Sequence, residues 1–236
     1  AKMDEATGRG AAALAAYETL REQAPWPLAA EATLRAASLG HTLGKTALPD
    51  AIDQLEVLAL TWHGRPTEIA TLGALGGLYE EAGRWRKIFT TARRANALSP
   101  EAPITRALHD RALAVFEDLF LTPRGEKLGG VEALALYFDF KDFAPAGRRA
   151  DEIVRRLADR LVALDLLDSA DELLQYQIDH RLEGAARSSV SARLATIRLM
   201  EGKPLQALQT LDATHLLELP EDVRRARALL RARALS

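Results

Sequence analysis

Two apolar stripes separated by a glycine constrain how residues 67–100 can fold. The first stripe consists of Leu72, Leu75, Gly76 and Tyr79, and the second of Trp85, Ile88, Ala92, Ala95 and Leu98. Residues spaced by three and four positions line one face of an α-helix. Between the stripes, Gly83 can adopt the left-handed conformation that ends a helix, and Pro100 ends the second helix. The segment therefore predicts two antiparallel helices that pack against each other.

The composition extends this prediction to the whole chain of 236 residues. Alanine, leucine and arginine are frequent, whereas aromatic residues make up only 6% of the sequence. Helix-forming residues thus outweigh the β-branched and aromatic residues that favour strands, and we expect an all-α fold. No segment has the roughly 18 consecutive apolar residues of a membrane-spanning helix.

The charge and the cysteine content exclude several functions. A net charge of −2 provides no broad positive field for nucleic acid or anionic lipid. The chain contains no cysteine, which excludes disulfides, thiolate metal sites and cysteine catalysis. We expect a soluble protein of the bacterial cytoplasm or periplasm, and the lack of cysteine is compatible with both compartments.

The paired stripes resemble the tetratricopeptide repeat, a helical hairpin of about 34 residues. The resemblance is carried by Leu72, Leu75, Gly76, Tyr79, Gly83, Trp85, Ala92, Ala95 and Pro100, with Ile88 where the family usually has alanine. It implies that Gly76 and Ala92 let helix backbones approach so that successive hairpins stack. Tyr79 and Trp85 then fill the space beside them. We interpret these glycines and aromatics as packing residues, not as a ligand pocket.

Weaker copies of this pattern occupy residues 8–25, 152–179 and 191–220. The last two copies align through Leu157, Ala158, Leu161, Leu167, Ala170 and Leu174, and through Leu194, Ala195, Gly202, Ala207 and Leu211. The pattern is weak in residues 28–64 and 103–145, although helices are expected in both segments.

The repeats imply an all-α superhelix, a tetratricopeptide-like solenoid of antiparallel helical hairpins. We expect one such solenoid across residues 1–236, as a fragment of a larger protein. Residues 101–147 form an irregular segment within it, and residues 220–236 form an unpaired C-terminal helix.

By resemblance, the first helix of each hairpin lines a concave groove that suits a peptide or a helix of another protein. The residues expected on this surface are Ala70, Gly73, Gly77 and Glu80 in the best copy, Glu152, Arg155, Asp159 and Val162 in the next, and Ser189, Ala192, Thr196 and Leu199 in the third. Some family members clamp a C-terminal carboxylate with lysine and asparagine. That set is missing here, because Arg155 and Asp159 stand in its place.

Two further groups are candidates for partner binding. Tyr137 and Phe140 belong to the densest aromatic stretch of the chain, and they are either core residues or an exposed contact patch. Arg224, Arg227 and Arg231 share one helix face, which is either a solvated surface or a grip for an acidic partner or nucleic acid. No aromatic residues alternate with these arginines, which counts against single-stranded nucleic acid.

Motifs for catalysis and cofactor binding are weak. The segment Gly40–Thr46, GHTLGKT, is one residue shorter than a phosphate-binding loop and follows a predicted helix where a strand is required. We therefore expect a flexible loop between two helices. No two histidines stand four residues apart, and no G-x-S-x-G nucleophile motif is present. The sequence predicts no cofactor and no metal.

These observations favour a non-enzymatic adaptor that binds a peptide or helix of a partner, within a larger bacterial assembly. The alternative is an enzyme or small-ligand protein with a pocket between the irregular segments, where Lys45, His109 and Lys141 converge. A third hypothesis is self-association through the C-terminal helix of residues 220–236.

Overall fold

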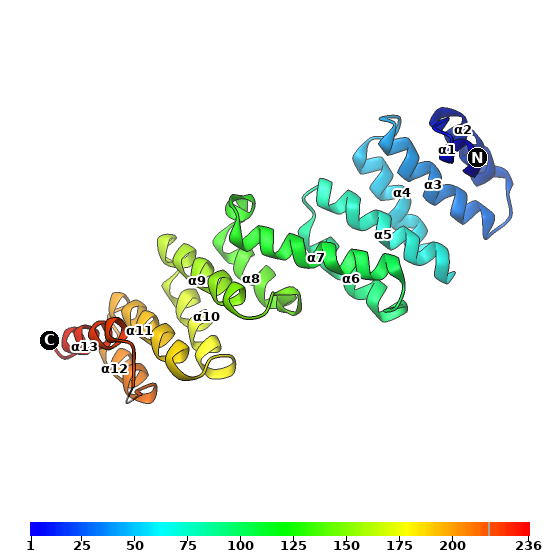
Figure 1. The fold of residues 1–236 in the computed structure, drawn as a ribbon. Coiled ribbons are helices and arrows are strands. Elements are labelled where there is room, and N and C mark those ends of the chain that lie inside the picture. Colours follow the sequence, from blue (N-terminus) through cyan, green and yellow to red (C-terminus); the bar gives the residue numbers. More distant parts are fainter. Residues whose placement is uncertain (217) are drawn as a thin grey trace. The chain divides into compact units, whose positions relative to one another are not determined.

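Figure 1 shows the fold in a computed structural model that describes residues 1–216 and 218–236. These residues form thirteen α-helices and two short 3-10 helices, and they contain no β-strand. The prediction of an all-α fold is confirmed. Within the described ranges, every helix is too short or too polar to cross a lipid bilayer. The packing divides the chain into two compact units, Ala1–Phe116 (unit 1) and Glu117–Ser236 (unit 2).

Unit 1 is a stack of helices in which each packs on the next along the chain. Its helices are α1 (Lys2–Ala6), α2 (Gly10–Gln23), α3 (Leu28–Thr42), α4 (Leu48–Thr61), α5 (Arg65–Glu81) and α6 (Trp85–Leu98), followed by the first part of α7 (Pro103–Leu121). Short turns join neighbouring helices, so successive helices are antiparallel. In addition, α3 contacts α5, so first helices of successive hairpins lie side by side.

The hairpin expected in residues 67–100 is present as α5 and α6. Its predicted stripes are buried at Leu72, Leu75, Tyr79, Ile88, Ala92 and Ala95. Gly83 lies in the turn with a φ of +66°, the left-handed conformation that the sequence required. Phe89 is also fully buried and packs edge to face on Phe116 at 5.8 Å between ring centroids, a core contact that the stripe pattern did not include.

Glycines on α5 make room for α7, the first helix after the hairpin. A Cβ atom on Gly76 would lie 2.2 Å from Cδ1 of Leu108, which is buried. A Cβ atom on Gly73 would lie 2.5 Å from Cγ2 of Ile104, whose side chain is 43% exposed. Gly76 thus serves the contact between successive hairpins.

The segment Gly40–Thr46 forms the end of α3 and the turn that leads into α4, between two helices as the sequence predicts. The backbone N–H groups of Lys45 and Thr46 both donate to the carbonyl oxygen of Gly40, at 2.8 and 3.0 Å. Gly44, with a φ of +67°, reverses the chain toward α4. A helix that ends in such hydrogen bonds has no free N–H groups to wrap a phosphate.

Unit 2 continues the same architecture after a more irregular start. It contains the end of α7, then η1 (Pro123–Lys127), α8 (Gly130–Phe140), η2 (Lys141–Phe143), α9 (Arg148–Ala163), α10 (Leu167–His180), α11 (Gly184–Met200), α12 (Pro204–Ala213) and α13 (Glu221–Leu235). Helices α9 and α10 form one hairpin and α11 and α12 the next, and α10 packs on α11.

The aromatic stretch on α8 is core, which corrects its use as a partner-binding patch. Tyr137 is 1% exposed and Phe140 is 3% exposed. The Tyr137 hydroxyl accepts a hydrogen bond of 3.0 Å from Nε2 of Gln177, which is buried on α10. Because a ring with a satisfied polar end is stable inside a core, α8 directs these rings inward.

The C-terminal helix α13 packs on both α11 and α12. The sequence interpretation that Arg227 belongs to an exposed arginine face is wrong, because this side chain is buried. Its guanidinium donates to the carbonyl oxygens of Ser188 and Leu211. Leu229, on the same helix, is 65% exposed, and self-association through this helix stays a prediction.

The Gly76–Leu108 contact predicts a difference between two otherwise equivalent substitutions. Gly76→Ala and Gly73→Ala gain the same helix propensity. We expect Gly76→Ala to be the less stable of the two by about 1–3 kcal/mol, because buried Leu108 must shift whereas exposed Ile104 can rotate away. Urea denaturation of both variants measures the difference. Equal stabilities would show that α7 adjusts freely.

His41, at the end of α3, predicts a pH dependence of stability in unit 1. Its Nε2 lies 2.9 Å from a carboxylate oxygen of Glu81, and this hydrogen bond raises the pKa of His41 above 6.5. Because the folded-state pKa is raised, the stabilisation is complete below pH 6.5 and disappears as the pH rises through the folded-state value. NMR titration of His41 should give a midpoint above 6.5 that falls in Glu81→Gln. The same midpoint in both proteins would contradict the assignment.

Candidate functional site

A groove between α9 and α11 is the best-formed site among the predicted binding surfaces. It encloses a cavity of about 350 Å³ in unit 2. Its lining comes from three helices and the turn before α11: Arg148, Asp151, Glu152, Val154, Arg155, Leu174, Gln177, Leu182, Ala186, Ser189, Val190 and Arg193. Glu152, Arg155 and Ser189 are residues that the repeat resemblance places on the concave surface. We name this site the α9–α11 groove.

The strong amphipathicity of α9 explains how the groove is built. Ile153, Leu157 and Leu161 recur at intervals of four and are buried against the neighbouring helices. The charged residues of the helix therefore lie on its other faces. From α10, the buried residues Leu174 and Gln177 reach the floor of the groove between the two first helices.

The charged side chains along the groove hold one another in place. Arg155 donates to both carboxylate oxygens of Glu152, at 2.6 and 2.7 Å, and to Asp159 at 3.2 Å. Arg156 also donates to Glu152, at 2.6 Å. These hydrogen bonds, first from Arg155 and then from Arg156, lower the pKa of Glu152 to about 2. At neutral pH this carboxylate is therefore fully ionised.

The ion-pair network crosses from α9 to α11 through Arg193. Its guanidinium pairs with Asp159, and the same carboxylate also binds Arg155. Burial lowers the pKa of Arg193, and the nearby charge of Arg155 adds to this effect. Two guanidinium groups thus share Asp159, so the network joins the two walls of the groove.

The sequence prediction included Glu152, Arg155 and Asp159 but missed Arg193. The spacing of four residues from Ser189 would have placed Arg193 on the same helix face. Thr196 lies one turn farther along α11 and donates to the carbonyl oxygen of Ala192 at 3.0 Å. It is not part of the groove lining, and its role in binding stays a prediction.

In unit 1, the predicted surface residues of α5 lie beside α7. Glu80 accepts a hydrogen bond of 2.7 Å from Arg111. A Cβ atom on Gly77 would lie 3.9 Å from the same guanidinium. Gly73 lies against the side chain of Ile104 on α7. These three residues line a contact between helices, and their use by a partner stays a prediction.

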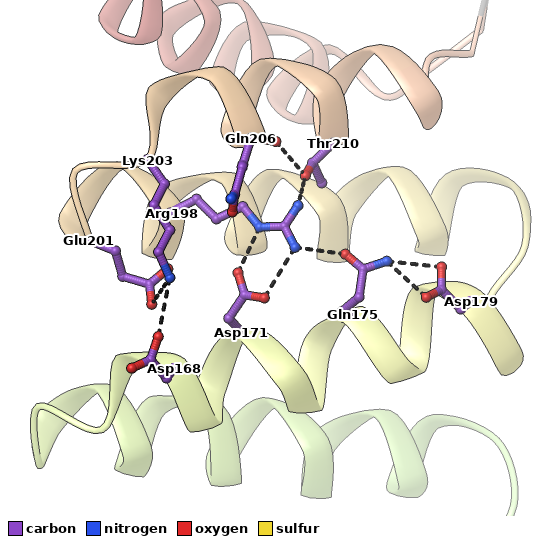
Figure 2. Close-up of polar contacts among 9 residues, drawn as sticks. All are labelled: Asp168, Asp171, Gln175, Asp179, Arg198, Glu201, Lys203, Gln206 and Thr210. Atoms are coloured by element: carbon purple, nitrogen blue, oxygen red, sulfur yellow. Dashed lines mark hydrogen bonds and ion pairs between the residues drawn. The ribbon is translucent and has the colours of Figure 1, made fainter.

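A second polar cluster, shown in Figure 2, joins α10, α11 and α12. Arg198 of α11 binds both carboxylate oxygens of Asp171, at 2.6 and 3.1 Å, and donates to Gln175 at 2.9 Å. It also donates to Thr210 of α12. Arg198 is 14% exposed and Asp171 is 20% exposed. Because Asp171, Gln175 and Thr210 all stand on helices packed against α11, the cluster fixes one hairpin on the next.

The residues proposed for an enzymatic pocket do not form a group within either unit. Lys45 and His109 belong to unit 1, whereas Lys141 belongs to unit 2. The Lys141 ammonium donates to the Tyr176 hydroxyl at 2.5 Å and lies 4.4 Å from the centre of that ring. Among the residues that the structure describes, no group of three or more histidine, aspartate or glutamate side chains is arranged to hold a metal.

Comparisons with known proteins give no family assignment. No family model matches the sequence, and no curated protein matches it. Among solved structures, BtubC (BKLC) from P. vanneervenii is similar, with 15% sequence identity and a TM-score of 0.36 over 94% of this chain and 90% of that chain.

A kinesin light chain with nearly identical TPR-like repeats from Podosopora anserina is also similar. It has 17% identity and a TM-score of 0.31 over 84% of this chain and 94% of that chain. A variant of that protein has 17% sequence identity and a TM-score of 0.31, over 85% of this chain and 95% of that chain. All these TM-scores lie below 0.5. The description of the fold as tetratricopeptide-like therefore rests on the helix packing within each unit.

The cluster in Figure 2 predicts unequal effects for two aspartates on α10. We expect Asp171→Ala to destabilise the protein by about 1–3 kcal/mol, because it leaves the largely buried Arg198 without a carboxylate. Asp168→Asn is the control, since Asp168 is 94% exposed where it pairs with Lys203, and we expect no measurable change. Urea denaturation tests both. Similar losses of stability in the two variants would contradict the structural role of Arg198.

Proposed function

We propose that this chain is a protein-interaction module that holds a peptide or helix of a partner in the α9–α11 groove, as part of a larger bacterial assembly. The observation that carries the proposal is the combination of an apolar floor with a charged rim in one cavity. Both walls belong to unit 2, so the site is complete within one compact unit. An adaptor of this kind binds its partner without chemical change.

The floor of the groove supports binding of an apolar side chain. Val154 and Leu174 are buried at its base, and Leu182 and Val190 are partly exposed beside them. Burying an aliphatic side chain contributes about 1.5–3 kcal/mol. Anchoring by one such side chain in a desolvated pocket is how many protein interfaces obtain most of their affinity.

The rim supports selection of the partner more than affinity. Glu152, Arg155, Asp159 and Arg193 already satisfy one another, so a partner exchanges existing ion pairs for new ones. Exchange of this kind adds little net free energy but penalises a partner whose charges are wrongly placed. The fixed geometry of the network also means that few side chains must be ordered on binding.

A substitution on the groove wall tests the proposal. Random peptides displayed on phage are selected on the wild-type chain, and their affinities are measured by fluorescence anisotropy. We expect Val190→Arg to weaken binding at least about tenfold, because the larger charged side chain fills the apolar floor. Circular dichroism of the variant confirms that the helices are retained.

Leu205→Arg is the matched control, because Leu205 is 73% exposed on α12 and does not line the groove. Its affinities should equal those of the wild-type chain. Equal binding by Val190→Arg and Leu205→Arg, or the failure of any selected peptide to bind the wild type, would contradict the proposed function.

A further inference from the structure

We propose that a second cavity, between α12 and α13, binds an amphipathic anion: a carboxylate or phosphate attached to an apolar group. This cavity measures about 250 Å³. It is lined by Leu211, His215, Leu216, Leu219, Arg224, Arg227, Ala228 and Arg231. The proposal does not depend on the α9–α11 groove, because the two cavities share no lining residue. We name this site the α12–α13 cavity.

The charge of the lining points to an anion. Three arginines contribute to it, and no carboxylate does among the described residues. Arg231 pairs with Asp212, which stands outside the lining. Arg224 has no carboxylate partner within residues 1–216 and 218–236. An incoming anion would therefore meet at least one guanidinium group that no protein carboxylate neutralises.

Arg227 strengthens the positive potential from inside the protein. Its side chain is only 7% exposed, yet its guanidinium contacts neutral oxygens: the carbonyls of Ser188 and Leu211 and the hydroxyl of Thr214. The carbonyl end of α12 offsets part of this charge. Burial lowers the pKa of Arg227, but arginine stays protonated in proteins. The carboxylate of Asp212 acts on Arg227 through its charge without a hydrogen bond to it, and an anion bound in the cavity would add to this stabilisation.

The remainder of the lining selects for an apolar group on that anion. Leu211, Leu216, Leu219 and Ala228 line the cavity together with the arginines. A free inorganic anion would leave this apolar surface exposed to water, whereas an attached alkyl group would cover it. Two sources supply the same chemistry: a small organic anion, and an acidic side chain next to a leucine in a partner protein.

Isothermal titration calorimetry of the full chain with hexyl phosphate tests the site. Inorganic phosphate and hexanol, which each carry half of the proposed ligand, should bind more weakly than hexyl phosphate. In the double variant Arg224→Gln/Arg231→Gln, we expect the affinity for hexyl phosphate to fall at least about tenfold, because two charge-assisted contacts are lost. Both side chains are exposed, so the variant keeps the fold.

Arg225→Gln is the matched control, since Arg225 lies on the same helix, pairs with Glu221 and does not line the cavity. It should bind like the wild type. A leucine–glutamate–leucine peptide distinguishes the sources: tighter binding than hexyl phosphate identifies an acidic protein segment, and weaker binding a small organic anion. The proposal is overturned if no anion binds the wild type, or if the double variant and Arg225→Gln bind equally.

Discussion

The structure depends on the burial of each apolar helix stripe against the next helix in the chain. Most of the stability of a helix in a folded protein comes from the apolar face that it buries and not from its own backbone. In unit 1, Ile52 and Leu55 of α4 and Ile88 of α6 are entirely buried by this stacking. A chain of hairpins needs no contacts between distant residues for such a core. Its outer faces are thereby left for binding.

Apolar stacking alone does not set how one hairpin is rotated on the next, and arginines that reach across several packed helices supply that information. In unit 1, Arg94 of α6 donates to the carbonyl oxygen of Ala59 at 2.8 Å and to the buried Glu68 at 2.9 Å, and thus ties together α4, α5 and α6. In unit 2, Arg198 connects three helices in the same manner (Figure 2). A guanidinium has several donors in a fixed plane, so it fits only one arrangement of acceptors.

The sequence predicts those features that depend on local spacing. The α5–α6 hairpin follows from its stripes and from Gly83, and the charged face of α9 follows from the spacing of its buried residues. The pairing of Phe89 with Phe116 could not be predicted, because each ring finds its partner in another helix. Tyr137 was ambiguous for the same reason, since its hydroxyl is satisfied by Gln177, 40 residues later.

For the arginines of α13, the spacing correctly predicts a shared helix face but does not predict which part of that face other helices cover. Arg224, Arg227 and Arg231 do share one face, as their spacing requires, but that face is turned toward α12. Spacing fixes which residues lie together on a helix and says nothing about which side of the helix is covered. Of the three side chains, Arg227 is buried, whereas Arg224 and Arg231 stay exposed. All three line the α12–α13 cavity beside leucines, so the buried charge of Arg227 is screened least by water and would contribute most to binding of the proposed anion.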